Sequence, residues 1–256
     1  MKCRGFTLLE LVIVLVLIAI SSMIGLRFIS DMAYNHVSSA ERGQALAGAR
    51  FAIERLRREL RQAYSPSVYV RVDNKCISYV PVIAAGTYTG QVQNASAEFI
   101  LPVNFQKIEL NGNNMAINAP SAIDTGLAAW QSYPADLPEN VVSLKTGITN
   151  ANGLGFADLF DNTNPPDFLS DSSKKRYTLL KPEQVRFCVE NGKLKRATQK
   201  GGPDWENSSL MLTGLVSDNV FGEYSQSSQL VTVDLTLATR DGNLVLSSQL
   251  QVGYEP

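Results

Sequence analysis

Histidine and cysteine are scarce in this sequence, which has one histidine and three cysteines among 256 residues. Zinc sites are built mainly from these two residue types, so the scarcity argues against such a site and excludes any mechanism that needs two histidines. An excess of one charge is also lacking, since Lys and Arg number 23 and Asp and Glu number 24. We therefore expect no nucleic-acid partner. Hydrophobic residues make up 45% of the chain, enough for a packed core.

Catalytic motifs are lacking as well. The sequence contains no GxSxG, no HExxH and no phosphate-binding P-loop. The one histidine, His36, stands in a polar stretch that is distant along the chain from Cys76 and Cys188. We expect no enzymatic activity and no cofactor.

What the sequence does have is one long apolar run, from residue 6 to residue 26. A run of about 20 apolar residues is long enough to cross a hydrocarbon core as a helix. Lys2 and Arg4 precede it and place that end on the cytoplasmic side. A cleaved secretory signal would need a shorter run with a small-x-small site. A plain signal anchor would not explain Glu10, because a carboxylate in the bilayer is costly without a partner.

The residues at the start of this run carry a family resemblance. They read Gly5-Phe6-Thr7-Leu8-Leu9-Glu10 after a basic leader. This order resembles the class III signal of type IV pilins and of the pseudopilins of type II secretion. The resemblance implies that a prepilin peptidase cuts after Gly5 and methylates the amine of Phe6. It also implies that Glu10 sets axial register against the next subunit.

Elementary electrostatics supports that role for Glu10. After cleavage, Phe6 would carry a cationic amine about one helical turn from Glu10. Between neighbouring helices of a bundle, an amine and a carboxylate can pair, and the low dielectric of the membrane strengthens the pairing. A carboxylate that snorkels to the interface without a partner is the alternative. A lone subunit would then be less stable in the bilayer than a packed one.

The helix is expected to continue well past the membrane. No proline occurs between residues 27 and 63, and Ser65-Pro66 is expected to end the helix. The apolar positions step by three and four residues, which defines one stripe for packing on a domain. The members of the stripe are Leu46, Ala49, Ile53, Leu56, Leu60 and Ala63. Five arginines between residues 50 and 61 are interleaved with glutamates and are interpreted as a solvated face.

After Pro66 the pattern changes to the alternation that is typical of strands. Short strands are predicted over residues 68–72, 76–82 and 96–103, and hairpins over 105–117, 185–198 and 229–252. The second hairpin has Asn191-Gly192 as a two-residue turn. Residues 113–140 and 150–175 are rich in Pro, Asn, Asp and Ser and are expected to be loops. The predicted fold class is α+β, with one long N-terminal transmembrane and amphipathic helix packed on antiparallel β-sheet.

Cys76 and Cys188 are the two cysteines that would remain after removal of a leader containing Cys3. An even pair in an exported domain favours a disulfide in an oxidising compartment. Two separate buried thiols are the alternative. A metal site is not expected, although Asp158, Asp161 and Asp167 form a weak calcium candidate that lacks EF-hand spacing.

The order of hydrophobic segments after residue 185 also resembles the larger minor pilins, notably that of the mannose-sensitive haemagglutinin pilus system, and the J-type pseudopilins. The implied organisation is a cleaved leader over residues 1–5, a transmembrane and assembly helix over 6–29, an extended helix packed on the ectodomain over 30–65, and an antiparallel β-rich periplasmic domain over 66–256. The implied location is the inner membrane with a single pass and then a pilus fibre or its tip.

Three functions stay open on the sequence alone. The first is a structural minor pilin that enters, or starts assembly of, a type IV pilus near the tip. The second is a J-type minor pseudopilin of a type II secretion system. The third is a membrane-anchored ligand-binding ectodomain. For the first two, the resemblance implies other pilin subunits, the prepilin peptidase and an inner-membrane assembly platform as partners.

Overall fold

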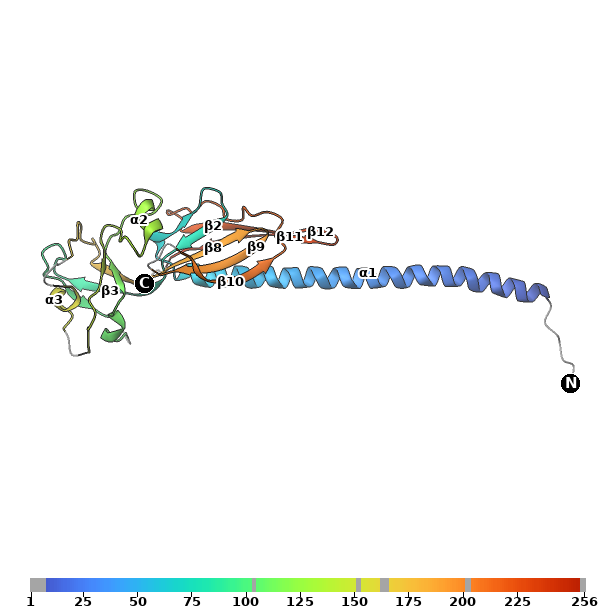
Figure 1. The fold of residues 1–256 in the computed structure, drawn as a ribbon, viewed down its shortest axis with the longest axis horizontal. Coiled ribbons are helices and arrows are strands. Elements are labelled where there is room, and N and C mark those ends of the chain that lie inside the picture. Colours follow the sequence, from blue (N-terminus) through green and yellow to red (C-terminus); the bar gives the residue numbers. More distant parts are fainter. Residues whose placement is uncertain (1–7, 103–104, 151–152, 162–165, 201–203, 254–256) are drawn as a thin grey trace.

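A long helix projects from a β-rich body (Figure 1). The computed structural model describes residues 8–102, 105–150, 153–161, 166–200 and 204–253. Helix α1 (Leu8–Arg61) has 54 residues and is therefore about 80 Å long. Its C-terminal part lies along the body, while its N-terminal part extends away from it (Figure 1). The fold is α+β, as predicted.

The predicted stripe is the face of α1 that packs on the body. Ala49, Leu56 and Leu60 are fully buried, and Ile53 is nearly so. Ala52, one residue before Ile53, widens the buried stripe and was missed by the strict spacing of three and four. Small alanines at this face let the sheet approach the helix closely, so the helix is held by shape as well as by apolar area.

Helix α1 ends at Arg61, short of the expected boundary at residue 65. The chain here leaves helical bonding for strand-like bonding. The amide of Tyr64 donates to the carbonyl of Val80, and the amide of Val82 donates to the carbonyl of Gln62. A short 3-10 helix, Ser65–Ser67, then carries Pro66 at its start. Tertiary pairing therefore ends the helix before the proline does.

Five antiparallel strands form the sheet next to α1, which we call the proximal sheet. Its order is β1-β2-β8-β9-β10. The strands are β1 (Tyr69–Val70), β2 (Cys76–Tyr79), β8 (Gln184–Glu190), β9 (Lys193–Gln199) and β10 (Glu206–Thr213). The predicted strand over 76–82 is thus split at Val80-Pro81.

The hairpin of β8 and β9 is confirmed, with Asn191 and Gly192 as its turn. Both residues have positive φ, 51° and 68°, which a type I′ turn requires. A side chain at Gly192 would also meet the carbonyl of Leu215 at 2.7 Å. The turn therefore needs glycine for its backbone and for the close approach of the next segment.

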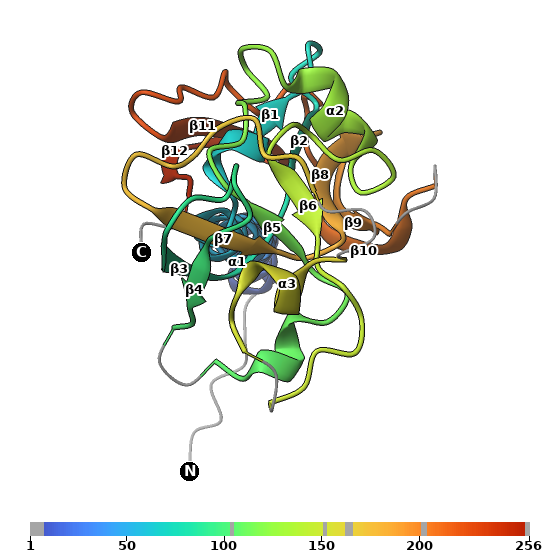
Figure 2. The same ribbon diagram turned by 90° about the vertical axis from the view of Figure 1, so that its left-hand side faces the viewer.

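A second predicted hairpin, β11 (Leu230–Thr239) with β12 (Gly242–Gln251), is also confirmed. Its turn is tighter than the four residues expected, because Thr239 pairs directly with Gly242. Alternate residues of β11, including Val231, Val233 and Leu235, are fully buried in the core shared with α1. Figure 2, which looks along α1, shows this hairpin and the proximal strands curving around the helix.

A second five-stranded sheet, the distal sheet, has the order β4-β3-β7-β5-β6. Its strands are β3 (Val82–Thr89), β4 (Glu98–Ile100), β5 (Asn114–Ala116), β6 (Val141–Ser143) and β7 (Arg176–Leu180). Short helices lie between them, namely η2 (Lys107–Leu110), α2 (Leu127–Ser132) and α3 (Phe156–Leu159). The entire sheet is inserted between β2 and β8, which are neighbours in the proximal sheet.

The predicted hairpin over residues 105–117 is wrong. Residues 107–110 form the 3-10 helix η2, and β5 pairs with β6 and β7 instead. The Asn111-Gly112 pair favours a local hairpin, but β5 instead pairs with strands that lie further along the chain. The two stretches expected to be loops also contribute β5, α2 and α3.

An aromatic cluster joins the two sheets. Trp130 lies in α2, and Tyr133 is the residue that follows this helix. Both side chains are fully buried beside Val80 and Leu180. The Trp130 indole N–H donates to the carbonyl of Pro120 at 2.8 Å, and its ring lies 5.7 Å from that of Tyr64. Tyr64 belongs to the segment just after α1, so this cluster attaches the distal sheet to the C-terminal end of the helix. The distal sheet therefore lies at the end of the body opposite the N-terminus (Figure 1).

Candidate assembly helix

The N-terminal half of α1 presents apolar side chains outward in all directions. Leu8 is 80% exposed, Met23 is 64% exposed and Phe28 is 63% exposed. The helix contains a window long and apolar enough to cross a membrane, and none of that window is buried within the described chain. A helix that is apolar all round needs a hydrophobic solvent or other helices around it.

The residues that the sequence singles out lie at the start of this half. Glu10 is in the first turn of α1 and on its exposed surface. Gly5 and Phe6 lie outside the described residues. The cleavage, the methylation and the register role of Glu10 stay predictions.

The tip of the β11–β12 hairpin contacts α1 where the helix enters the body. The side chains of Tyr34 and Ser38 donate hydrogen bonds to Asp241, the first at 3.2 Å. Arg240 pairs with Glu41 at 2.9 Å, and its guanidinium also lies over the ring of Tyr34. These contacts extend the hold of the body on α1 toward the apolar half, beyond the buried stripe.

Further along, a charged network pins α1 to the proximal sheet. Glu59 accepts hydrogen bonds from Arg196 of β9 at 2.8 Å, from Arg55 at 2.7 Å and from the Tyr79 hydroxyl at 2.8 Å. Burial alone would raise the pKa of Glu59, but the bonds from the two arginines and the tyrosine outweigh it and lower the pKa. Burial and the nearby Glu59 carboxylate raise the pKa of Tyr79 well above its usual value. The ionised Glu59 therefore stabilises the packed helix.

Sequence reasoning placed Glu59 only on a solvated face. Its place between Leu56 and Leu60, both fully buried, indicates that it borders the apolar stripe. The sequence thus indicates that Glu59 lies at the edge of the helix–sheet contact. Its partner Arg196 is 137 residues further along the chain, so residue spacing within the helix could not predict the pair. The arginines divide in the same way: Arg58 is exposed, whereas Arg55 is drawn into the network.

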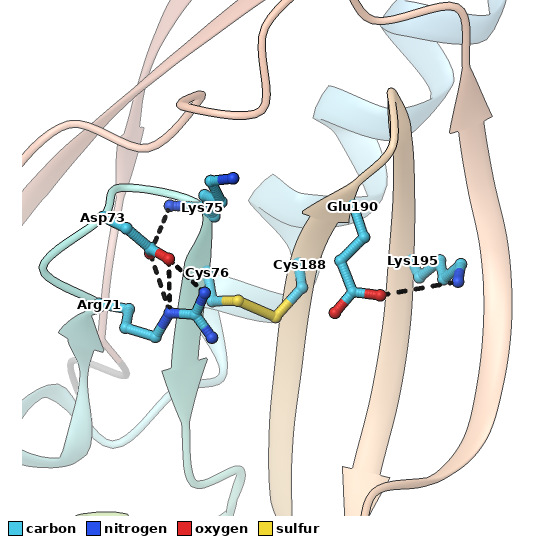
Figure 3. Close-up of a disulfide and its surroundings, with 7 residues drawn as sticks. All are labelled: Arg71, Asp73, Lys75, Cys76, Cys188, Glu190 and Lys195. Carbon is cyan, nitrogen blue, oxygen red and sulfur yellow. Dashed lines mark hydrogen bonds and ion pairs between the residues drawn. A yellow bond between two sulfur atoms is a disulfide. The ribbon is translucent and has the colours of Figure 1, made fainter.

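Cys76 and Cys188 form a disulfide (Figure 3). They face each other as direct partners on the neighbouring strands β2 and β8. Ion pairs flank the bond on the same face, Arg71 with Asp73 on one side and Glu190 with Lys195 on the other. The disulfide fastens together the two strands between which the distal sheet is inserted.

The calcium candidate receives no support. Asp158 instead accepts the backbone N–H of Gly155 at 3.0 Å and caps the start of α3. Among the residues that the structure describes, no group of three or more His, Cys, Asp or Glu side chains could hold a metal ion. Part of the loop between Asp161 and Asp167 lies outside those residues.

Residues 1–26 match the family model described as the prokaryotic N-terminal methylation motif. No curated protein and no solved structure matches the chain. The motif supports a type IV pilin-like or pseudopilin protein with prepilin processing, a structural rather than enzymatic class. Its match covers the leader and most of the exposed apolar half of α1, whose membrane-length window is not buried within the described chain.

Proposed function

We propose that this protein is a minor pilin that enters, or starts assembly of, a type IV pilus near its tip. Residues 1–5 are removed by the prepilin peptidase, and residues 6–29 hold the subunit in the inner membrane until assembly. The rest of α1, from residue 30 to Arg61, and the β-rich domain that follows it lie in the periplasm. The observation that carries the proposal is an apolar half-helix, exposed all round, that begins in a methylation motif.

The physics of that half-helix favours assembly over simple anchoring. In lipid, apolar side chains satisfy the bilayer but give a helix no specific partner. Glu10 supplies specificity, because a carboxylate in hydrocarbon is strongly stabilised by a cationic group at a fixed place on a neighbouring helix. The methylated amine of Phe6 on a neighbouring subunit is such a group. Transfer from bilayer to filament then adds this charge pair between subunits and keeps the apolar contacts.

The C-terminal half of α1 suits the same function in a different way. It is fixed to the body by its buried stripe and by Glu59, so a pull on the helix is transmitted to the whole subunit. The distal sheet lies at the end of the body farthest from the N-terminus (Figure 1). In a tip subunit that sheet would point outward, away from the membrane.

The test of the proposal is the variant Glu10→Leu. Removing the carboxylate from the membrane segment should leave the level in the inner membrane unchanged or raised, while incorporation into filaments falls severalfold. The assay is co-purification with assembly partners, alongside membrane fractionation. Glu98→Leu, the same change at an exposed site on β4, is the matched control and should assemble normally. Normal assembly of Glu10→Leu, or loss of its membrane insertion, would contradict the proposal.

Processing gives an independent check. Intact mass of the membrane-extracted protein should show loss of residues 1–5 and gain of one methyl group at Phe6. An intact Met1, or an N-terminus beyond Ser21, would exclude a pilin-type protein altogether.

A J-type minor pseudopilin of a type II secretion system is the second candidate, because the same motif and the same C-terminal pattern of strands fit it. Deletion of the gene separates the two. We expect loss of surface pili with normal secretion of exoproteins. The reverse result would assign the protein to secretion, and its partners would then be pseudopilins.

A further inference from the structure

The solvent-facing side of the proximal sheet carries a small pocket that the assembly function does not use. Side chains alternate along β8, so Val185, Phe187 and Val189 enter the core shared with α1. Arg186 and Cys188 point to the opposite side, where they line a cavity of about 100 Å³. The disulfide of Cys188 with Cys76 makes the floor of this cavity rigid.

Arg186 is the unusual member of the pocket. Its Nε is buried and has no hydrogen-bond partner among the residues that the structure describes. A buried guanidinium N–H without an acceptor is costly, and native proteins rarely leave one unsatisfied. The same guanidinium lines the cavity, so an acceptor that enters the cavity can meet its remaining nitrogens.

Trp205 closes one side of the cavity. The Arg186 guanidinium carbon lies 4.0 Å from the centre of the Trp205 ring, in a cation–π contact. The ring covers one face of the guanidinium. The N–H groups lie in the guanidinium plane, so a hydrogen-bond acceptor must approach its edge. Burial lowers the pKa of Arg186, and the nearby Glu190 carboxylate opposes this effect.

We propose that this pocket binds a carboxylate group through the edge of Arg186. A guanidinium edge matches a carboxylate in shape and can donate two parallel hydrogen bonds. A cavity of about 100 Å³ holds a carboxylate with its adjoining methylene but not a large ligand. Lys195 and Glu190 stand at the rim as an ion pair with N···O 3.8 Å. The negative charge of Glu190 repels a doubly charged anion such as phosphate more than a singly charged carboxylate. The paired Lys195 reduces the repulsion between Glu190 and the carboxylate.

Two sources supply this chemistry: an Asp or Glu side chain of a neighbouring protein, and a free small carboxylic acid. The experiment uses the full chain in detergent micelles, labelled with [15N]tryptophan. The protein has two tryptophans, so its spectrum should show two indole N–H signals. Trp130 is fully buried and bonded to Pro120, which makes its signal an internal reference. Trp205→Phe assigns the other signal.

Sodium acetate, titrated against sodium chloride at equal ionic strength, should shift the Trp205 signal saturably and leave that of Trp130 in place. Arg186→Gln should weaken acetate binding at least about tenfold, since a charge-assisted pair is lost. The matched control is Arg71→Gln, an exposed arginine paired with Asp73 near the same disulfide (Figure 3). Arg71 also acts on Arg186 through its charge, so this variant should weaken acetate binding slightly, and far less than Arg186→Gln does. An intact 76–188 disulfide and an unmoved Trp130 signal report that each variant is folded.

A second variant keeps the test independent of Arg186. Glu190→Gln removes a like charge from the rim and should tighten acetate binding about two- to fivefold. A second ligand is glutamate blocked as its N-acetyl, N-methylamide derivative. If it binds more tightly than acetate and the corresponding glutamine derivative does not bind, the ligand is a protein side chain. Acetate that binds at least as tightly would identify a free acid. No saturable shift, equal binding by Arg186→Gln, or tighter binding of inorganic phosphate than of acetate would overturn the proposal.

Discussion

The two halves of α1 are one continuous helix with opposite requirements. The half that follows residue 45 has a buried stripe, a charged network and small residues facing the sheet, and its own chain satisfies all three. The half before residue 27 is almost entirely apolar, and the described body covers none of its membrane-length window. One half is therefore complete within the monomer, and the other requires a bilayer or a filament.

This contrast shows how a single helix can serve two states of a subunit. Stability of the body depends on residues that no partner needs to touch. Under the proposed function, assembly depends on residues whose side chains are not buried in the folded body. Mutations should therefore separate into two classes, and the following predictions are arranged from the largest expected effect to the smallest.

Removing the disulfide should have the largest effect on the packed half. The bond closes a loop with a sequence separation of 112, and the chain-entropy argument gives about 5 kcal/mol for its loss. Cys76→Ala with Cys188→Ala should lower the free energy of unfolding of the body by that amount. Thermal unfolding followed by near-ultraviolet circular dichroism measures it. Membrane fractionation should remain unchanged, and a loss of insertion would mean that the two halves are not independent.

Leucine truncation tests the two halves directly. Leu56→Ala removes a fully buried side chain from the stripe and should cost about 3 kcal/mol in the unfolding of the body. Leu17→Ala, in the exposed half, should change that free energy by less than about 0.5 kcal/mol. Both variants are compared by thermal unfolding in the same detergent. Equal costs would show that the body also relies on the apolar half.

Glu59 and Glu54 give a matched pair on the same helix, the first 15% and the second 66% exposed. Glu59→Gln should cost about 2 kcal/mol at neutral pH because it weakens bonds to Arg196 and Arg55. Glu54→Gln should cost almost nothing.

The pH dependence sharpens that pair. The pKa of Glu59 in the folded protein lies below its ordinary value of 4.5, so its stabilisation is present above that value and is lost as pH falls below it. Acidification below pH 4.5 should therefore destabilise Glu59→Gln less steeply than the parent. An unchanged acid slope would mean that Glu59 does not stabilise the body through its charge.

The smallest effect is expected at the hairpin tip. Asp241→Asn weakens the contacts to Tyr34 and Ser38 and should cost about 0.5–1 kcal/mol, confined to the region where α1 leaves the body. Faster amide hydrogen exchange around Ser38 measures it. Asp234→Asn, at an exposed site on the same hairpin, is the control and should leave that exchange as it is.

Much of the proximal half of the body could be predicted from sequence because its signals are local. The Asn191-Gly192 turn, the alternation along β11 and the three-and-four spacing of Leu56 and Leu60 each fix structure within a few residues. The distal sheet gave no such signals. Strands of three residues, such as β4, β5 and β6, are too short for a pattern and form only because distant partners pair with them.

The sequence by itself determined that the N-terminal segment is helical and apolar, that it begins with a methylation motif, and that the packed helix ends within a few residues before Pro66. These are properties of neighbouring residues and of their hydrogen-bonding period. Only the tertiary structure decided that the distal sheet is inserted between β2 and β8, that Glu59 meets Arg196, and that Trp205 covers Arg186. Each of these contacts depends on the packing of the sheets, because burial and register, not spacing along the chain, bring such side chains together.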